Sequence, residues 1–92
     1  MRSRRSPQFR KLFRDLPPDI KSQAYAAYRL FVLDPRHPSL HFKKLHDNLY
    51  SVRVGSHYRA LGITENSSLI IWIWIGSHAD YDKLIKRLIE GK

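Results

Sequence analysis

The feature that most constrains the fold is a run of seven apolar residues, Leu69 to Ile75, which ends at Gly76. Its side chains are apolar at odd and even positions alike, which is typical of a well-covered strand inside a sheet. A helix that crosses a bilayer needs about 20 apolar residues, so this run is far too short to be one. The chain is therefore expected to build a sheet around residues 69–75.

Two further strands are predicted before this run, because the apolar period changes to two. Residues 50–54 alternate between apolar and polar side chains, with Arg53 on the polar face. A turn at residues 55–56 leads to a strand over residues 58–63, and a second turn follows at residues 65–67. Together with the apolar run, these segments predict an antiparallel meander of three main strands.

The first half of the chain has helical periodicity instead. Ser6-Pro7 is a typical helix start, and the apolar residues after it recur at i, i+3, i+4 and i+7. Pro17-Pro18 ends this helix and begins another, which stops at residues 34–35. A short terminal helix is indicated by four apolar residues near the end of the chain: Leu84, Ile85, Leu88 and Ile89.

This order of elements predicts an α+β domain, with the N-terminal helical hairpin packed on one face of a small antiparallel sheet. Residues 36–47 contain Pro38 and read as an extended, partly anchored connection. Ninety-two residues suffice for one core, so residues 1–92 are expected to form a single domain. The chain lacks cysteine and begins with a basic stretch that no apolar segment follows, which together favour a soluble, cytoplasmic protein.

The net charge of +9 predicts a polyanionic partner. Residues 1–46 hold eleven of the seventeen Lys and Arg but only three of the eight Asp and Glu, so most of the excess lies in the N-terminal half. The alternative is a charge that only keeps the protein soluble, which rarely requires so uneven a distribution.

The register of the first hairpin places two arginines opposite each other. A two-residue loop would turn Arg59 toward the helices and bury its charge, whereas a three-residue loop of residues 55–57 pairs Val54 with Tyr58 and Arg53 with Arg59. The second register is favoured, although facing like charges repel each other by up to about 1 kcal/mol. Such a pair suggests a bound phosphate, or else two arginines that only solvate the sheet or pair with acids.

The segment after the apolar run carries groups that transfer protons. Ser77 and Asp80 have capping-box spacing, so a helix is expected to begin at Ser77. His78 and Tyr81 then share a helical face near the helix N-terminus. Histidine suits proton transfer near neutral pH, and a phenol can orient or protonate a leaving oxygen, although a histidine there is often only structural.

Other catalytic patterns are missing from the sequence. It contains no phosphate-binding glycine loop and no metalloprotease motif, and the histidines of residues 36–47 lack companions at metal-ligand spacing. No metal or cofactor is therefore expected. Trp72 and Trp74 are interpreted as core or sheet-face packing. The remaining chemistry is metal-free phosphoryl transfer on a nucleic acid.

Four stretches together resemble the RelE/ParE superfamily of toxins from type II toxin–antitoxin systems, in this order: SPQFRKLFRDLPPDI, HPSLHFKKL, YSVRVGSHYRAL and IWIGSHADYD. The resemblance covers nearly the whole chain and implies a RelE-like fold, with a short N-terminal strand over at most residues 2–5. It also implies an mRNA endoribonuclease, or mRNA interferase, that acts in the ribosome, inhibits translation and is covered by a cognate antitoxin. Cleavage in such members needs no metal, because the ribose 2′-hydroxyl attacks the adjacent phosphate.

Carried over residue by residue, the resemblance assigns catalytic roles to Arg53, Arg59, His78 and, more loosely, Tyr81. It implies that mRNA or rRNA contacts come from a second set: Arg10, Lys11, Arg14, Lys43, Lys44 and His57. Ser51 stands where strongly active members carry a lysine, which leaves the general base open between His78 and His57. The alternative is a ParE-like inhibitor that binds DNA gyrase without cutting RNA, and a further one is a small RNA-binding module.

Overall fold

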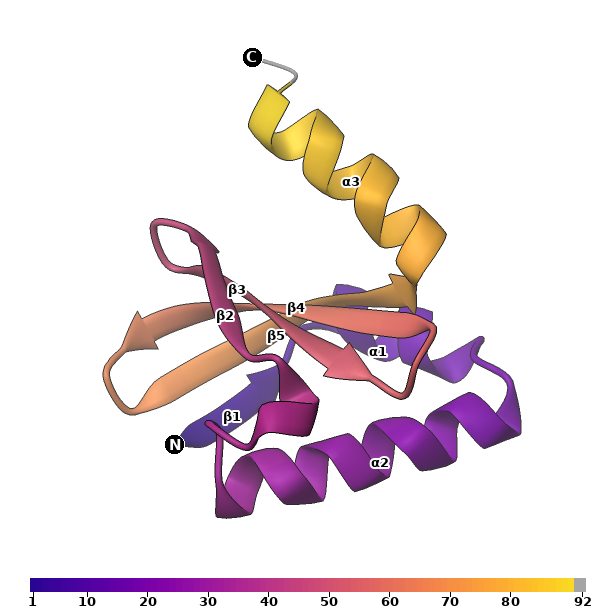
Figure 1. Ribbon diagram of the computed structural model, residues 1–92, viewed down its shortest axis with the longest axis horizontal. Coiled ribbons are helices and arrows are strands. Elements are labelled where there is room, and N and C mark those ends of the chain that lie inside the picture. The colour runs from indigo at the N-terminus through magenta and orange to yellow at the C-terminus, as the bar shows by residue number, and fades with distance from the viewer. Residues whose placement is uncertain (91–92) are drawn as a thin grey trace.

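The computed structural model describes residues 1–90, with side chains described for residues 1–88. One five-stranded sheet has the order β1-β5-β4-β3-β2 and is flanked by helices (Figure 1). Its strands are β1 (Arg2–Arg5), β2 (Lys43–His46), β3 (Leu49–Val54), β4 (Tyr58–Asn66) and β5 (Leu69–Ser77). The helices are α1 (Pro7–Arg14), α2 (Pro18–Leu33) and α3 (His78–Glu90), and Pro38–Leu40 forms a 3-10 turn.

The predicted α+β class is confirmed, and so is the meander of β3, β4 and β5. The apolar run forms most of β5, which is an interior strand because β1 and β4 pair with it on either side. Two details of the sheet differ from the prediction. Part of the expected connection over residues 36–47 is a fifth strand, β2, and the short strand β1 runs parallel to β5, so the sheet is mixed.

The helix boundaries follow the capping residues. Ser6 caps α1, because its Oγ accepts the backbone N–H of Phe9 at 3.1 Å, and Pro7 occupies the first helical position. Pro18 opens α2, which ends at Leu33. The side chain of Ile89, expected on the apolar side of the terminal helix, lies outside the described side chains.

The main core lies between the helical hairpin and one face of the sheet. Phe9 of α1 and Phe31 of α2 pack there against residues of three strands, among them Val52, Ala60 and Trp72. Tyr28 of α2 is 46% exposed and lies at the margin of this core. Both helices therefore cover one face, and we call the opposite face of the sheet the open face.

The loop between β3 and β4 has three residues, as the register argument predicted. Val54 pairs with Tyr58, Val52 with Ala60, and Arg53 with Arg59. Gly55 begins the loop with φ +61°, a left-handed conformation that other residues adopt at a cost of roughly 1 kcal/mol. A Cβ there would only displace the exposed amide end of Gln23, so the positive φ is the main reason for glycine. The loop thus fixes the register that brings the two arginines together.

Candidate active site

A small group of side chains is buried on the open face as well. Leu61 is 0% exposed and Tyr81 is 8% exposed, yet neither belongs to the core under the helical hairpin. Ser51 pairs with Leu61 across β3 and β4 and is also buried. Tyr81 comes from the first turn of α3, which rises from the end of β5 on the side opposite to α2 (Figure 1). The start of α3 therefore borders the open face.

Arg53 and Arg59 lie directly opposite each other on this face, and we call them the arginine pair. Both side chains are half-buried. Arg59 donates from Nη1 to the carbonyl oxygen of Tyr58 at 3.0 Å, whereas the buried Nε of Arg53 has no hydrogen-bond partner among the described residues. Within residues 1–88, no carboxylate lies within 4.0 Å of either guanidinium. Within this part of the chain, the pair therefore has none of the acidic partners that a purely structural role would supply.

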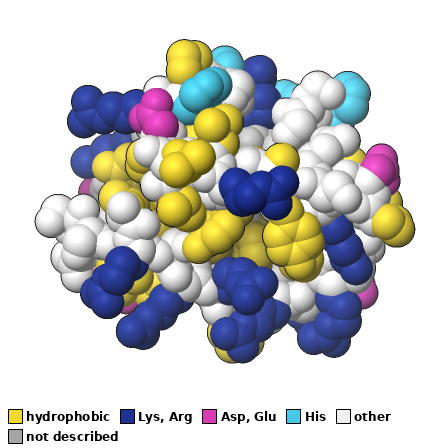
Figure 2. Space-filling view, turned by 90° about the horizontal axis from the view of Figure 1, so that it is seen from below, with side chains coloured by type: hydrophobic (Ala, Val, Ile, Leu, Met, Phe, Trp, Pro, Cys, Tyr) yellow, Lys and Arg dark blue, Asp and Glu magenta, His cyan; other side chains and the backbone are white. Residues whose placement is uncertain are grey.

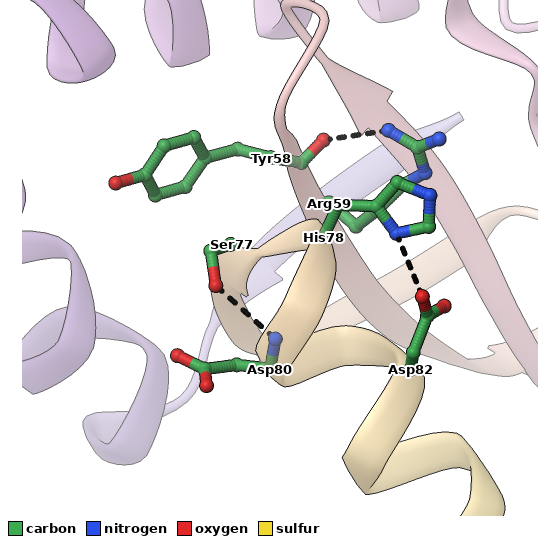
Figure 3. A network of polar contacts seen from close by, with 6 residues as sticks. All are labelled: Tyr58, Arg59, Ser77, His78, Asp80 and Asp82. Atoms are coloured by element: carbon green, nitrogen blue, oxygen red, sulfur yellow. Dashed lines mark hydrogen bonds and ion pairs between the residues drawn. The ribbon is translucent and has the colours of Figure 1, made fainter.

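Two hydrogen bonds fix the start of α3, and one of them joins it to the loop between β3 and β4. Ser77 Oγ accepts the backbone N–H of Asp80 at 3.1 Å, which confirms the predicted cap. The backbone N–H of His78 donates to the carbonyl oxygen of His57 at 2.7 Å. Because Arg59 pairs with Gly76, this contact fixes His78 close to Arg59, and Figure 3 shows the imidazole and the guanidinium directed to the same region.

A carboxylate that the sequence argument missed orients His78. Nδ1 of His78 lies 3.3 Å from Oδ2 of Asp82, one helical turn later (Figure 3). With Nδ1 as the donor in this contact, Nε2 is left to accept or donate a proton. The i,i+4 spacing of the two residues on the predicted helix was a signal that could have found Asp82.

Tyr81 lies directly beside His78. Its side chain is buried, and it meets the imidazole of His78 edge-on, with ring centroids 6.2 Å apart. Such a contact restricts the orientation of the histidine ring. The structure thus brings Tyr81 into contact with His78 in the candidate site.

The candidate RNA-binding residues fall into two groups. Lys43 is exposed and pairs with Ser51, so it shares the open face with the arginine pair, whereas Lys44 pairs with Tyr50 of the opposite face. His57 is exposed in the loop that contacts α3. Three residues, Arg10, Lys11 and Arg14, are exposed on α1. Because α1 packs on the other side of the sheet, the structure does not bring these three to the arginine pair.

No group of three or more His, Asp or Glu side chains in the described part of the chain is arranged to hold a metal ion. No helix there combines the length and the apolarity needed to cross a membrane.

Several toxin structures share this fold. The RelB-RelE antitoxin-toxin complex from Methanococcus jannaschii matches with a TM-score of 0.69 at 19% identity, over 88% of this chain and 96% of that one. The isolated RelE toxin from E. coli matches with a TM-score of 0.64 at 16% identity, over 96% and 98%. The YoeB/ParE toxin from Agrobacterium tumefaciens gives 0.65 at 11% identity, over 85% and 99%.

The sequence itself was compared with family models and with curated proteins. A search of the curated protein sequences found no match. The model of the ParE-like toxin domain matches residues 18–83, which include the arginine pair, His78 and Asp82. This match extends over well over half of the chain, and the RelE structures agree with it in fold. The chain therefore belongs to the family of ParE-like toxin domains, within the RelE/ParE superfamily.

Proposed function

We propose that this protein is the toxin of a type II toxin–antitoxin system and cuts mRNA in the ribosome without a metal ion. The observation that carries this proposal is the arginine pair, whose two residues face each other across β3 and β4 and have no carboxylate neighbour within residues 1–88. A protein that only binds a partner does not need two opposed arginines next to an oriented histidine. A phosphate that gains negative charge during cleavage is stabilised by such a pair of arginines.

In the proposed reaction the ribose 2′-oxygen forms a bond to the adjacent phosphorus, and the bond from phosphorus to the 5′-oxygen breaks. His78 Nε2 takes the proton of the 2′-hydroxyl, and water protonates the departing 5′-oxygen. The guanidinium groups of Arg53 and Arg59 stabilise the extra charge on the non-bridging oxygens. Asp82 and Tyr81 keep the imidazole in one orientation. The product is a 2′,3′-cyclic phosphate.

The remaining charge suits a large RNA partner in the cytoplasm. The exposed residues of α1, Arg10, Lys11 and Arg14, lie on the far side of the sheet from the site. A single strand of mRNA held on the open face does not reach them, whereas the surrounding rRNA of a ribosome does. We propose that Lys43 and His57 contact mRNA. The basic residues of α1 and Lys44 contact rRNA in this proposal.

The proposed protein partner is a cognate antitoxin with an acidic or amphipathic segment. One face of the molecule offers a matching surface, where Lys and Arg surround an apolar area (Figure 2). Four large apolar side chains of α2 are substantially exposed: Tyr25, Tyr28, Val32 and Leu33. RelB accompanies RelE in the complex from Methanococcus jannaschii, which supports a partner of this kind.

The test is cleavage of a defined mRNA in a reconstituted translation system. Arg59→Ala should lower the cleavage rate by about 10²–10³-fold, since it removes a donor to the charged transition state. His78→Ala should lower it by about 10²–10⁴-fold. Arg29→Ala is the charge-matched control, because Arg29 is exposed on α2. This variant should cleave mRNA at the wild-type rate. Full cleavage by both site variants would show that the site is assigned wrongly.

A second candidate, inhibition of DNA gyrase by binding, is favoured by the match to a ParE-like domain model. The same preparation should therefore be added to a gyrase supercoiling assay. Inhibited supercoiling, together with intact mRNA in the translation system, would establish this candidate and exclude the ribonuclease.

A further inference from the structure

The two tryptophans of β5 lie on opposite faces of the sheet. One residue separates them, so a regular strand would place both on the same face. The register shifts between the pairs Leu61–Trp74 and Gly62–Trp72, which leaves Ile73 as the extra residue of a β-bulge. Trp72 consequently points into the core and is 5% exposed, whereas Trp74 lies half-buried on the open face.

The ring of Trp74 extends toward the arginine pair. A Cβ atom on Gly76 would lie 2.6 Å from Cζ2 and 2.7 Å from Cη2 of the Trp74 indole, so the six-membered ring covers Gly76. Gly76 is the cross-strand partner of Arg59, and His78 follows it by two residues. The absence of a side chain at Gly76 thus lets an aromatic surface reach the positions that hold phosphate and 2′-hydroxyl in the proposed reaction.

An aromatic ring next to basic side chains matches the base and the phosphate of one nucleotide. Proteins that bind single-stranded RNA stack bases on aromatic rings and hold the phosphates with basic side chains. The indole also covers its buried cross-strand neighbour Leu61, yet part of the ring remains open to solvent and can meet a base.

We propose that Trp74 is the stacking residue for the base next to the cleaved phosphate, an inference that rests on the proposed ribonuclease function. The base lies on the exposed part of the indole while the arginine pair holds the phosphate. Every base has a flat aromatic face, so this contact holds the RNA in place without selecting a particular base. β5 therefore provides a binding surface in addition to its place in the core.

Two substitutions of similar apolar character separate stacking from packing. Trp74→Phe keeps an aromatic ring, whereas Trp74→Leu keeps an apolar side chain without one. We expect Trp74→Leu to weaken RNA binding and to raise the KM for cleavage by about tenfold to a hundredfold, with a much smaller loss for Trp74→Phe. Ile71→Ala is the control, because Ile71 lies on the same face at the other end of β5. Equal binding and cleavage by the Leu and Phe variants would overturn the proposal.

Fluorescence gives a measurement that does not depend on cleavage. The chain has two tryptophans, so Trp72→Phe leaves Trp74 as the only one. A short single-stranded RNA with 2′-O-methyl groups, which cannot be cut by 2′-hydroxyl attack, should quench its emission in a saturable way. If the emission of Trp72→Phe stayed unchanged while the wild type cleaved mRNA, the stacking role would be refuted and the ribonuclease function would stand. Quenching by this RNA, with no cleavage by the wild type, would refute the ribonuclease and with it the place of Trp74 at a cleaved phosphate, leaving Trp74 as a contact for bound RNA only.

Discussion

At the scale of single residues, the contact between His78 and Asp82 shows how a small site can orient its proton-transfer group. Both side chains are largely solvent-exposed, at 49% and 64%. An exposed ion pair contributes little to folding, because water and salt weaken it. Its value in the proposed reaction lies in holding Nδ1, so that Nε2 faces the RNA.

Asp82→Asn is therefore expected to lower the cleavage rate only modestly, by at most about fivefold, and less at high salt. The amide keeps a group that can accept from Nδ1 but loses the negative charge. Asp80→Asn is the matched control on the same helix. Among the described side chains, His78 forms its ion pair with Asp82 and not with Asp80. A loss as large as that of His78→Ala would instead make Asp82 indispensable to the reaction.

At the scale of elements, α3 depends on its first turn for its position next to the sheet. Ser77 caps this turn through a hydrogen bond of 3.1 Å, and Ser6 caps α1 through one of the same length. The two caps use the same chemistry, but only α3 carries groups of the candidate active site. They therefore allow the effect of a lost cap on stability to be separated from its effect on activity.

Ser77→Ala and Ser6→Ala should each lower the free energy of unfolding by about 1 kcal/mol. Chemical denaturation followed by circular dichroism measures both. Only Ser77→Ala should also lower mRNA cleavage, because fraying at the start of α3 displaces His78 and Tyr81. If Ser6→Ala impaired cleavage to the same degree, the loss would come from general instability and the special role of α3 would be rejected.

Elements whose boundaries depend on local chemistry were predictable from the sequence. Ser6-Pro7 and Ser77 are capping signals that need no tertiary contact, and both were correct. The pairing of Arg53 with Arg59 was also predictable, since the other register buries a charge. These predictions succeeded because neighbouring residues along the chain, or one hairpin, determine the outcome.

Features that depend on distant partners were not predictable in the same way. β2 is short and carries two adjacent lysines, so it has no alternating pattern and becomes a strand only by pairing with β3. The bulge at Ile73 could not be predicted, because a continuous apolar run gives no sign of a register shift. For the same reason the sequence did not show that Trp72 and Trp74 lie on opposite faces of the sheet. The parallel pairing of β1 with β5 likewise joins segments more than 60 residues apart.

At the scale of the whole molecule, the basic charge is divided between two sides of the sheet. Lys43 and Lys44 are neighbours in β2 and both are exposed, yet only Lys43 shares the open face with the arginine pair. The net charge of +9 attracts RNA from any direction, whereas the strand alternation decides which lysine contacts RNA held at the site.

Lys43→Ala is therefore expected to weaken binding of a short single-stranded RNA and to reduce the slope of log affinity against log salt by about 0.7. Lys44→Ala should change both quantities less, although the two variants have the same net charge. Fluorescence anisotropy over a range of salt concentrations measures the slope. Identical slopes for the two variants would mean that overall charge alone governs binding.

The outermost strands of the sheet are both short and rich in basic residues. β1 carries three exposed arginines, at positions 2, 4 and 5, and β2 carries Lys43 and Lys44. Unpaired strand edges invite the edges of other molecules, and charged side chains are a common protection against such aggregation. Replacing these edge residues would therefore remove the repulsion that keeps neighbouring molecules apart, so variants that lose them would tend to precipitate.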